Sequence, residues 1–132
     1  MIIAISATGK DIDNKIYTKF ERCGCFLIVD LEKNTVLPIT NKAKDRPREI
    51  GGPIGHLISK VGVDKIITTD IGPRAMEIFK QHEIKVYRAE DIIEDAIKQL
   101  EMGKLSEITK ATLPRYSDWK KIKNQNEVFI NG

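Results

Sequence analysis

The sequence predicts an α/β protein built on a mixed five-stranded sheet, with its elements in the order β-β-β-α-β-α-β-α. Up to residue 49 the apolar residues fall in short runs of strand length, whereas from Ile50 they recur at helical spacing. In that second half, strand-length runs alternate with helical stretches, as in parallel strands joined by right-handed crossovers. We therefore expect hairpin-linked strands on one side of the sheet, parallel strands on the other, and helices covering it.

The first half of the chain supplies three predicted strands. Apolar runs occupy residues 2–5, 25–30 and 36–39, and Asn34 marks a turn between the second and third runs. This pattern is typical of a hairpin. The charged stretch 40–49 then predicts an exposed loop.

The second half supplies three helices and two strands. A helical stripe follows Gly51-Gly52-Pro53 and ends at Gly62, where a glycine cap is common. Pro73 has the fixed φ angle suited to the first residue of the next helix. Glu90 and Asp91 are expected to open the last helix. The predicted strands are 65–69 and 84–87, and the apolar stripe of the first helix is Ile54, Leu57, Ile58 and Val61.

Length and composition indicate a single soluble domain. The chain has 132 residues, 41% of them hydrophobic and 31% charged, and no apolar run approaches the roughly 20 residues of a membrane span. No signal peptide is recognisable at the N-terminus. Cys23 and Cys25 are separated only by Gly24, so a disulfide between them would be strained. We therefore expect free thiols and a cytoplasmic location.

The positive charge is concentrated at the C-terminal end. Residues 103–132 hold six basic and three acidic residues, which accounts for the whole net charge of +3. A neutral body argues against a nucleic-acid-binding domain. We place a domain at residues 1–105 and a basic C-terminal extension at 106–132. Within this extension, Tyr116, Trp119 and Ile122 could share one side of a short helix, and residues 128–130 could form a small strand.

Two glycine-led helix starts form the candidate binding site. Gly51-Gly52-Pro53 and Gly72-Pro73-Arg74 should direct backbone N–H groups, and the positive ends of two helix dipoles, toward one edge of the sheet. Arg22, Arg48 and Arg74 are candidate charge partners. A cluster, a phosphate or a carboxylate would fit this chemistry. The alternative is that the Gly-Pro pairs only make strand-to-helix turns.

The two cysteines and one histidine are candidate metal ligands. Cys23 and Cys25 could supply thiolates to an iron–sulfur cluster, and the imidazole of His56 could join them. Their spacing does not match that of self-sufficient metal sites. The alternative is that Cys25 belongs to the core, Cys23 is a loop thiol and His56 faces solvent.

Several stretches carry a family resemblance. Lys19-Phe20-Glu21-Arg22-Cys23 leads into the strand 26–30, Gly51-Gly52 follows, and residues 62–75 contain Ile71-Gly72-Pro73-Arg74. Residues 84–87 and 103–105 continue the pattern. Over residues 1–105 the chain resembles the dinitrogenase iron–molybdenum cofactor-binding family, carriers and accessory proteins with a ribonuclease H-like fold. Glu21 departs from that pattern, since the family commonly has glycine at this position.

The resemblance implies a function without catalysis. Such a protein would bind or carry an iron–sulfur or iron–molybdenum-type cluster, or assist its assembly, together with a donor or acceptor protein. A cluster-free interaction or regulatory module of the same fold, binding a protein partner or a small anion, is the alternative. Monomer and homodimer both remain open. A two-metal nuclease would need a carboxylate on the first strand, and residues 2–6 contain none.

Overall fold

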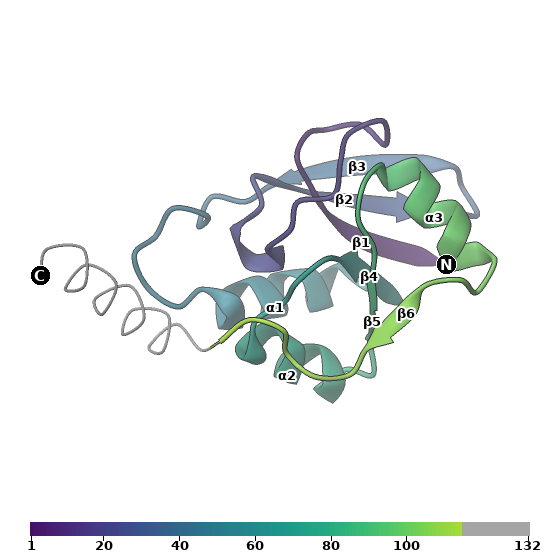
Figure 1. Ribbon diagram of the computed structural model, residues 1–132. Helices are drawn as coiled ribbons and strands as arrows, with labels where there is room; N and C mark the ends of the chain where they lie inside the picture. Colours follow the sequence, from purple (N-terminus) through teal and green to yellow (C-terminus); the bar gives the residue numbers. More distant parts are fainter. Residues whose placement is uncertain (115–132) are drawn as a thin grey trace, which may run out of the picture.

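The computed structural model describes residues 1–114, which form one mixed sheet with helices on both faces (Figure 1). The predicted helix around Trp119 and the predicted strand at 128–130 lie outside these residues. The strands are β1 (Ile2–Ala7), β2 (Cys25–Asp30), β3 (Thr35–Thr40), β4 (Lys65–Thr68), β5 (Lys85–Arg88) and β6 (Ser106–Ile108); the helices are α1 (Gly51–Val61), α2 (Pro73–Gln81), α3 (Ile93–Glu101) and the short 3-10 helix η1 (Phe20–Arg22).

The sheet has the order β3-β2-β1-β4-β5-β6. β1 pairs antiparallel with β2 and parallel with β4, and β4 pairs parallel with β5, so the expected mixture of hairpins and crossovers is confirmed. The sheet has six strands rather than five, because β6 adds antiparallel to β5 just after the predicted boundary at residue 105. Three residues are too few to show a strand period, and only pairing with β5 defines β6.

Alternating residues of the strands face two separate cores. Ala4 and Phe26 pack with α1 and α2, whereas Ile5 and Leu27 pack with α3. In Figure 1, α1 and α2 accordingly lie on one side of the sheet and α3 on the other. None of the helices within residues 1–114 is long and apolar enough to cross a membrane.

The turn residues have the conformations that their types favour, with two corrections to the helices. Gly62 caps α1 with φ of 85°, and Pro73 stands at the start of α2. The third helix begins at Ile93 and not at Glu90 or Asp91. Asp91 has φ of 71°, in the left-handed region, so it belongs to the preceding turn.

The second correction concerns the outer side of α1. Leu57 was expected in the buried stripe, yet 41% of its surface is exposed. Ile54 and Ile58, which carry most of the buried face, are only 3% and 0% exposed. A helix needs an apolar stripe only as wide as its contact with the sheet, and Leu57 lies outside it.

Three phenylalanine rings fix η1 against the sheet and α2. The Phe20 ring lies 5.0 Å from that of Phe26 and 5.4 Å from that of Phe79, the latter pair edge to face. All three side chains are fully buried. This cluster anchors η1, and Glu21 in η1 accepts a hydrogen bond from the Gly72 N–H just before α2.

We expect the Phe79→Ala variant to lose about 3–5 kcal/mol of unfolding free energy, because it removes a buried ring from this cluster and leaves a cavity. Leu57→Ala is the matched control and should cost less than about 1 kcal/mol, since Leu57 is partly exposed. Urea denaturation monitored by circular dichroism measures both. Equal losses in the two variants would contradict the packing described here.

Candidate functional site

The first turns of α1 and α2 lie against each other. A Cβ atom built on Gly51 would stand 3.1 Å from the Ala75 nitrogen and 3.2 Å from Arg74 Cβ. A side chain at residue 51 would therefore crowd the neighbouring backbone, and glycine permits the approach. We call Gly51, Gly52, Gly72, Arg74 and Ala75 the helix-start cradle. The convergence expected from the sequence is present.

Much of the backbone around this cradle is already hydrogen-bonded. The Ile71 N–H donates to Thr112 Oγ1 at 2.9 Å, and the Gly72 N–H donates to Glu21 Oε1 at 2.6 Å. On α1 the Gly52 N–H donates to Glu49 Oε1 at 3.2 Å. The expectation that the loop before α2 presents free N–H groups is therefore wrong at Ile71 and Gly72.

Three N–H groups of the cradle have no acceptor within residues 1–114, and two of them belong to the buried residues Gly51 and Ala75. Those of Gly51, Arg74 and Ala75 donate to no acceptor among residues 1–114. They come from both helices, whose starts lie so close that a Cβ on Gly51 would stand 3.1 Å from the Ala75 nitrogen. N–H groups at helix starts can donate hydrogen bonds to a negatively charged acceptor.

Glu21 is a site residue that the sequence analysis did not select. Its side chain is only 7% exposed, and its carboxylate accepts the hydrogen bond from Gly72. Burial raises the pKa of Glu21, the Gly72 hydrogen bond opposes that rise, and the negative charge of Glu49 adds to it. The one signal in the sequence was its place where the family commonly has glycine.

Arg22 shapes the segment between β3 and α1. Its guanidinium donates to the carbonyl oxygens of Lys44, Arg46 and Arg48 at 2.9, 2.7 and 3.0 Å. Such a planar group with several donors can bridge successive backbone carbonyls. Arg22 was predicted as a charge partner for a ligand, and the structure gives it this positioning role as well.

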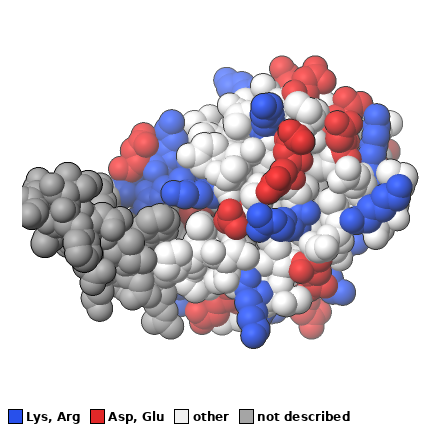
Figure 2. Space-filling view, viewed as in Figure 1, with Lys and Arg blue, Asp and Glu red and all other residues white. Residues whose placement is uncertain are grey.

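Arg74 and the segment that leads into α1 carry exposed basic side chains. Arg74 is exposed, forms an ion pair with Glu77 at 3.5 Å, and has its Nε 3.5 Å from the position of a Cβ on Gly52. The segment between β3 and α1 contributes Lys42, Lys44, Arg46 and Arg48, all exposed. In Figure 2 basic side chains gather at the left, where Figure 1 places this segment, with acidic ones among them.

The predicted metal ligands are not brought together. Cys23 is 0% exposed and packs in the core with α1 and α2, whereas Cys25 is 8% exposed and packs in the core with α3. Burial raises the pKa of the Cys23 thiol to about 12 and also raises that of Cys25. His56 is exposed on α1. Within residues 1–114 no three His, Cys, Asp or Glu side chains are grouped to hold a metal ion, so ligation by these residues stays a prediction.

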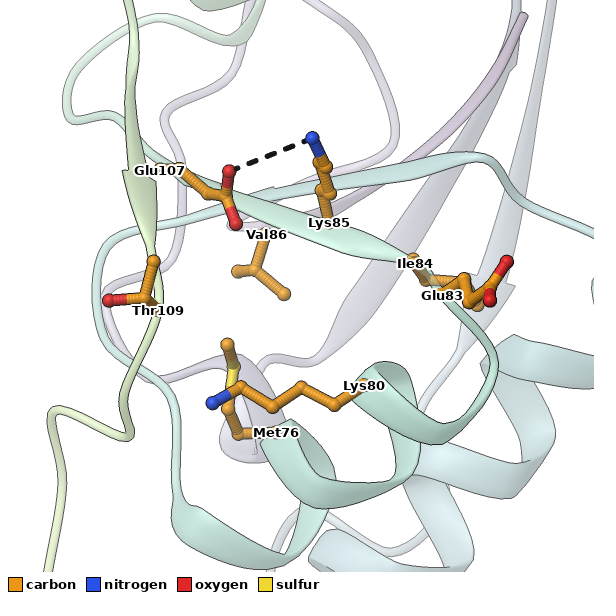
Figure 3. A pocket seen from close by; sticks show the side chains of 8 residues that line it. All are labelled: Met76, Lys80, Glu83, Ile84, Lys85, Val86, Glu107 and Thr109. Carbon is orange, nitrogen blue, oxygen red and sulfur yellow. Dashed lines mark ion pairs between the residues drawn. The ribbon is translucent and has the colours of Figure 1, made fainter.

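A hollow of about 650 Å³ lies elsewhere, between α2 and the strands β5 and β6. Figure 3 shows Met76 and Val86 at its centre, with the ion pair of Lys85 and Glu107, 4.0 Å long, along one rim. None of the residues predicted for the site lines it. The cradle and this hollow are separate features of α2.

Comparison with known proteins identifies the family of this chain. The family described as dinitrogenase iron-molybdenum cofactor matches residues 1–103. The chain belongs to the dinitrogenase iron-molybdenum cofactor family. An uncharacterized protein of Methanocaldococcus jannaschii is 36% identical over 97 residues, which cover 70% of this chain and 82% of that protein.

Solved structures support the same assignment. A Thermotoga protein suggested to be a NifB protein has 29% identity and a TM-score of 0.74, with 85% of this chain and 97% of that chain covered. A Methanocaldococcus jannaschii protein suggested to be a dinitrogenase has 31% identity and a TM-score of 0.63, covering 83% and 96%. The apo orange protein of Desulfovibrio gigas, at 21% identity and a TM-score of 0.79 over 85% and 96%, shares the fold.

We expect the Cys23 thiol to be unreactive in the folded protein. With a pKa of about 12, only about one thiol in ten thousand is a thiolate at about pH 8. Ellman's reagent should therefore fail to modify the Cys25→Ser variant until denaturant is added. Modification at the rate of an exposed cysteine, without denaturant, would contradict the burial of Cys23.

Glu21 should make stability depend on pH in a defined direction. Because its folded-state pKa lies above the usual 4.5, its contribution favours folding at low pH and is lost as the pH rises through the raised value. Each unit of elevation corresponds to about 1.4 kcal/mol. Relative to Glu21→Gln, the wild type should therefore gain stability when the pH is lowered from about 7.5 to about 4. Urea denaturation across this range tests it, and a difference between the two proteins that stays constant would contradict the prediction.

Proposed function

We propose that this protein is a carrier that binds an anionic metal–sulfur cluster of the iron–sulfur or iron–molybdenum type as its cargo, without catalysing a reaction. The observation that supports the proposal most directly is the contact between the two glycine-led helix starts. It groups the N–H groups of Gly51, Arg74 and Ala75, which donate to no acceptor within residues 1–114, close to the exposed charge of Arg74. Membership of the family agrees with such a role.

The side chains around the cradle favour holding the cargo by charge and hydrogen bonds. Gly51 and Gly52 let the two helix starts approach closely, and Arg74 brings a full positive charge to the exposed side. Arg22 keeps the segment with Arg48 in place beside them. This mode of binding needs no thiolate, which agrees with the burial of both cysteines.

The role as a carrier implies other proteins. A cargo that is held without several protein ligands can pass to an acceptor when a partner offers stronger ones. We therefore propose a cluster donor or acceptor as the partner, met in the cytoplasm. We propose no contact with nucleic acid or membrane. Monomer and homodimer are both compatible with this role.

A cluster-free interaction module is the second candidate function. Two N–H groups of the helix starts are already bonded to Glu21 and Glu49, and both cysteines are buried. A module of this kind would bind a small anion or a protein partner. The basic extension at 106–132 would then contribute to partner binding.

Anaerobic reconstitution with iron and sulfide tests the first function. We expect the wild type to gain visible absorbance and to retain iron after gel filtration. Arg74→Gln should retain clearly less, because it removes a positive charge at the cradle. Lys60→Gln is the matched control, since Lys60 is exposed at the opposite end of α1 and carries the same charge.

The outcomes separate the two functions. A wild type that stays colourless, with no iron retained, would contradict the carrier function. If that colourless protein also binds inorganic phosphate in calorimetry, and Arg74→Gln weakens the binding, the interaction module is supported. A variant ending at Pro114 keeps β6 and the Thr112 contact, so its loss of partner binding would be assigned to residues 115–132.

A further inference from the structure

The segment between β3 and α1 concentrates positive charge on the domain. Residues 42–48, which we call the basic segment, hold four basic residues and one acidic residue. Residues 1–102 hold 16 basic and 16 acidic residues, so outside the basic segment they hold 12 basic and 15 acidic ones. A segment with a net charge of +3 therefore stands on a domain whose other residues up to 102 have a net charge of −3.

The basic side chains of this segment have no carboxylate partner within residues 1–114. All four are exposed and belong to none of the ion pairs found there: Lys42, Lys44, Arg46 and Arg48. Glu49, the acidic residue that follows them, accepts a hydrogen bond from the Gly52 N–H instead. Like charges that lie close together without counter-ions attract a negatively charged group from outside the chain.

The fold gathers these residues and holds their backbone in place. Arg22 Nη1 donates to the carbonyl oxygens of Lys44 and Arg46 at 2.9 and 2.7 Å. Its Nη2 donates to the carbonyl oxygen of Arg48 at 3.0 Å. Asn41, just before the segment, is only 3% exposed and bonds to the backbone of η1. A segment that is already ordered loses less conformational entropy on binding than a mobile one.

The charge of the surrounding domain indicates which kind of anion fits. A nucleic acid or an anionic membrane extends well beyond seven residues, so it would also meet the net negative remainder of the domain. A short acidic segment of a protein can place its carboxylates on the basic segment alone. Guanidinium and ammonium groups form charge-assisted hydrogen bonds with such carboxylates.

We propose that the basic segment is a docking site for an acidic segment of a partner protein, whose Asp and Glu side chains pair with Lys42, Lys44, Arg46 and Arg48. Arg22 is a positioning residue, which shapes the segment for this contact. The inference goes beyond the proposed function, because it concerns a protein partner and holds whether or not the cradle takes up a cluster.

Fluorescence anisotropy with a labelled oligoglutamate peptide tests the proposal on the full chain at about 0.15 M salt. The triple variant Lys42→Gln/Lys44→Gln/Arg46→Gln should bind the peptide about tenfold more weakly than the wild type, because it removes three of the four charges. Arg48 is kept, since it is a candidate charge partner of the cargo. Arg22→Lys keeps the charge but lacks the planar group that bridges the carbonyl oxygens, so it should bind about threefold more weakly.

Two further triple variants are matched controls, one with charges removed elsewhere on the domain and one with charges removed from the extension. They are Lys60→Gln/Lys80→Gln/Lys104→Gln and Lys120→Gln/Lys121→Gln/Lys123→Gln. Both should bind the peptide within about twofold of the wild type, because charges outside the contact are screened at this salt concentration. Thermal unfolding of each variant confirms that the titrated proteins are folded.

The outcomes decide between the basic segment and other sources of binding. A loss of affinity confined to the variants of the basic segment and of Arg22 supports the docking site. Absence of peptide binding by the wild type, equal losses in all three triple variants, or a larger loss in the extension variant overturns it. Arg22→Lys that is folded and binds like the wild type overturns the positioning role of Arg22.

The same titration distinguishes the class of partner. A labelled DNA duplex or vesicles of phosphatidylserine should bind the wild type more weakly than the peptide does, because the remainder of the domain repels them. Tighter binding of either one than of the peptide overturns the assignment to a protein partner. No cluster enters these titrations, so their failure leaves the test of the carrier function by iron reconstitution unaffected.

Discussion

The close approach of α1 and α2 at their first turns is the constraint on which the site depends. A Cβ on Gly51 would stand 3.1 Å from the Ala75 nitrogen, and one on Gly55 would lie 3.0 Å from Ile78 Cδ1, so both glycines permit the close contact. Larger side chains would separate the helices. Their partial positive ends would then no longer act on the same ligand, because the dipole effect fades within about one turn.

The same contact explains why carboxylates of the chain collect nearby. Two helix starts on one edge of a sheet concentrate N–H groups and positive potential, and buried N–H groups need acceptors. Glu21 and Glu49 supply part of that need from within the chain. Thr112 supplies another part by bonding to Ile71, which also fastens the segment after β6 against the start of α2. The backbone N–H groups that stabilise the fold through these bonds are therefore the same ones that a ligand would need.

The sequence predicted the architecture well because the relevant signals are local. Runs such as residues 25–30, the glycine at 62 and the proline at 73 each determine one element or one boundary. β6 was missed since its pairing with β5 defines it. The start of α3 was misplaced because acidic residues suit both a turn and a helix start, and only the φ of Asp91 distinguishes them.

The site was harder to predict, for a physical reason. The glycines and Arg74 belong to local sequence patterns that are typical of helix starts, so their placement could be predicted from the sequence. Burial of Glu21 depends instead on residues about 50 positions away in the chain, and so does its bond to Gly72. In the linear sequence, the closely spaced Cys23 and Cys25 resemble a metal-binding pair. Cys25 is the first residue of β2 and Cys23 precedes that strand, and they fall into the cores on opposite faces of the sheet.

Arg22 donates hydrogen bonds to three backbone carbonyl oxygens of the segment between β3 and α1. The path of that segment is therefore determined separately from the charge of its side chains. Main-chain oxygens are the same for every residue type, so the path of the segment does not depend on which side chains Lys44, Arg46 and Arg48 carry. Those side chains are exposed and can be exchanged while Arg22, which is partly buried, keeps its hydrogen bonds to the three carbonyl oxygens. Substitutions of the exposed side chains in this segment can thus change its charge without changing its path, provided that Arg22 is kept.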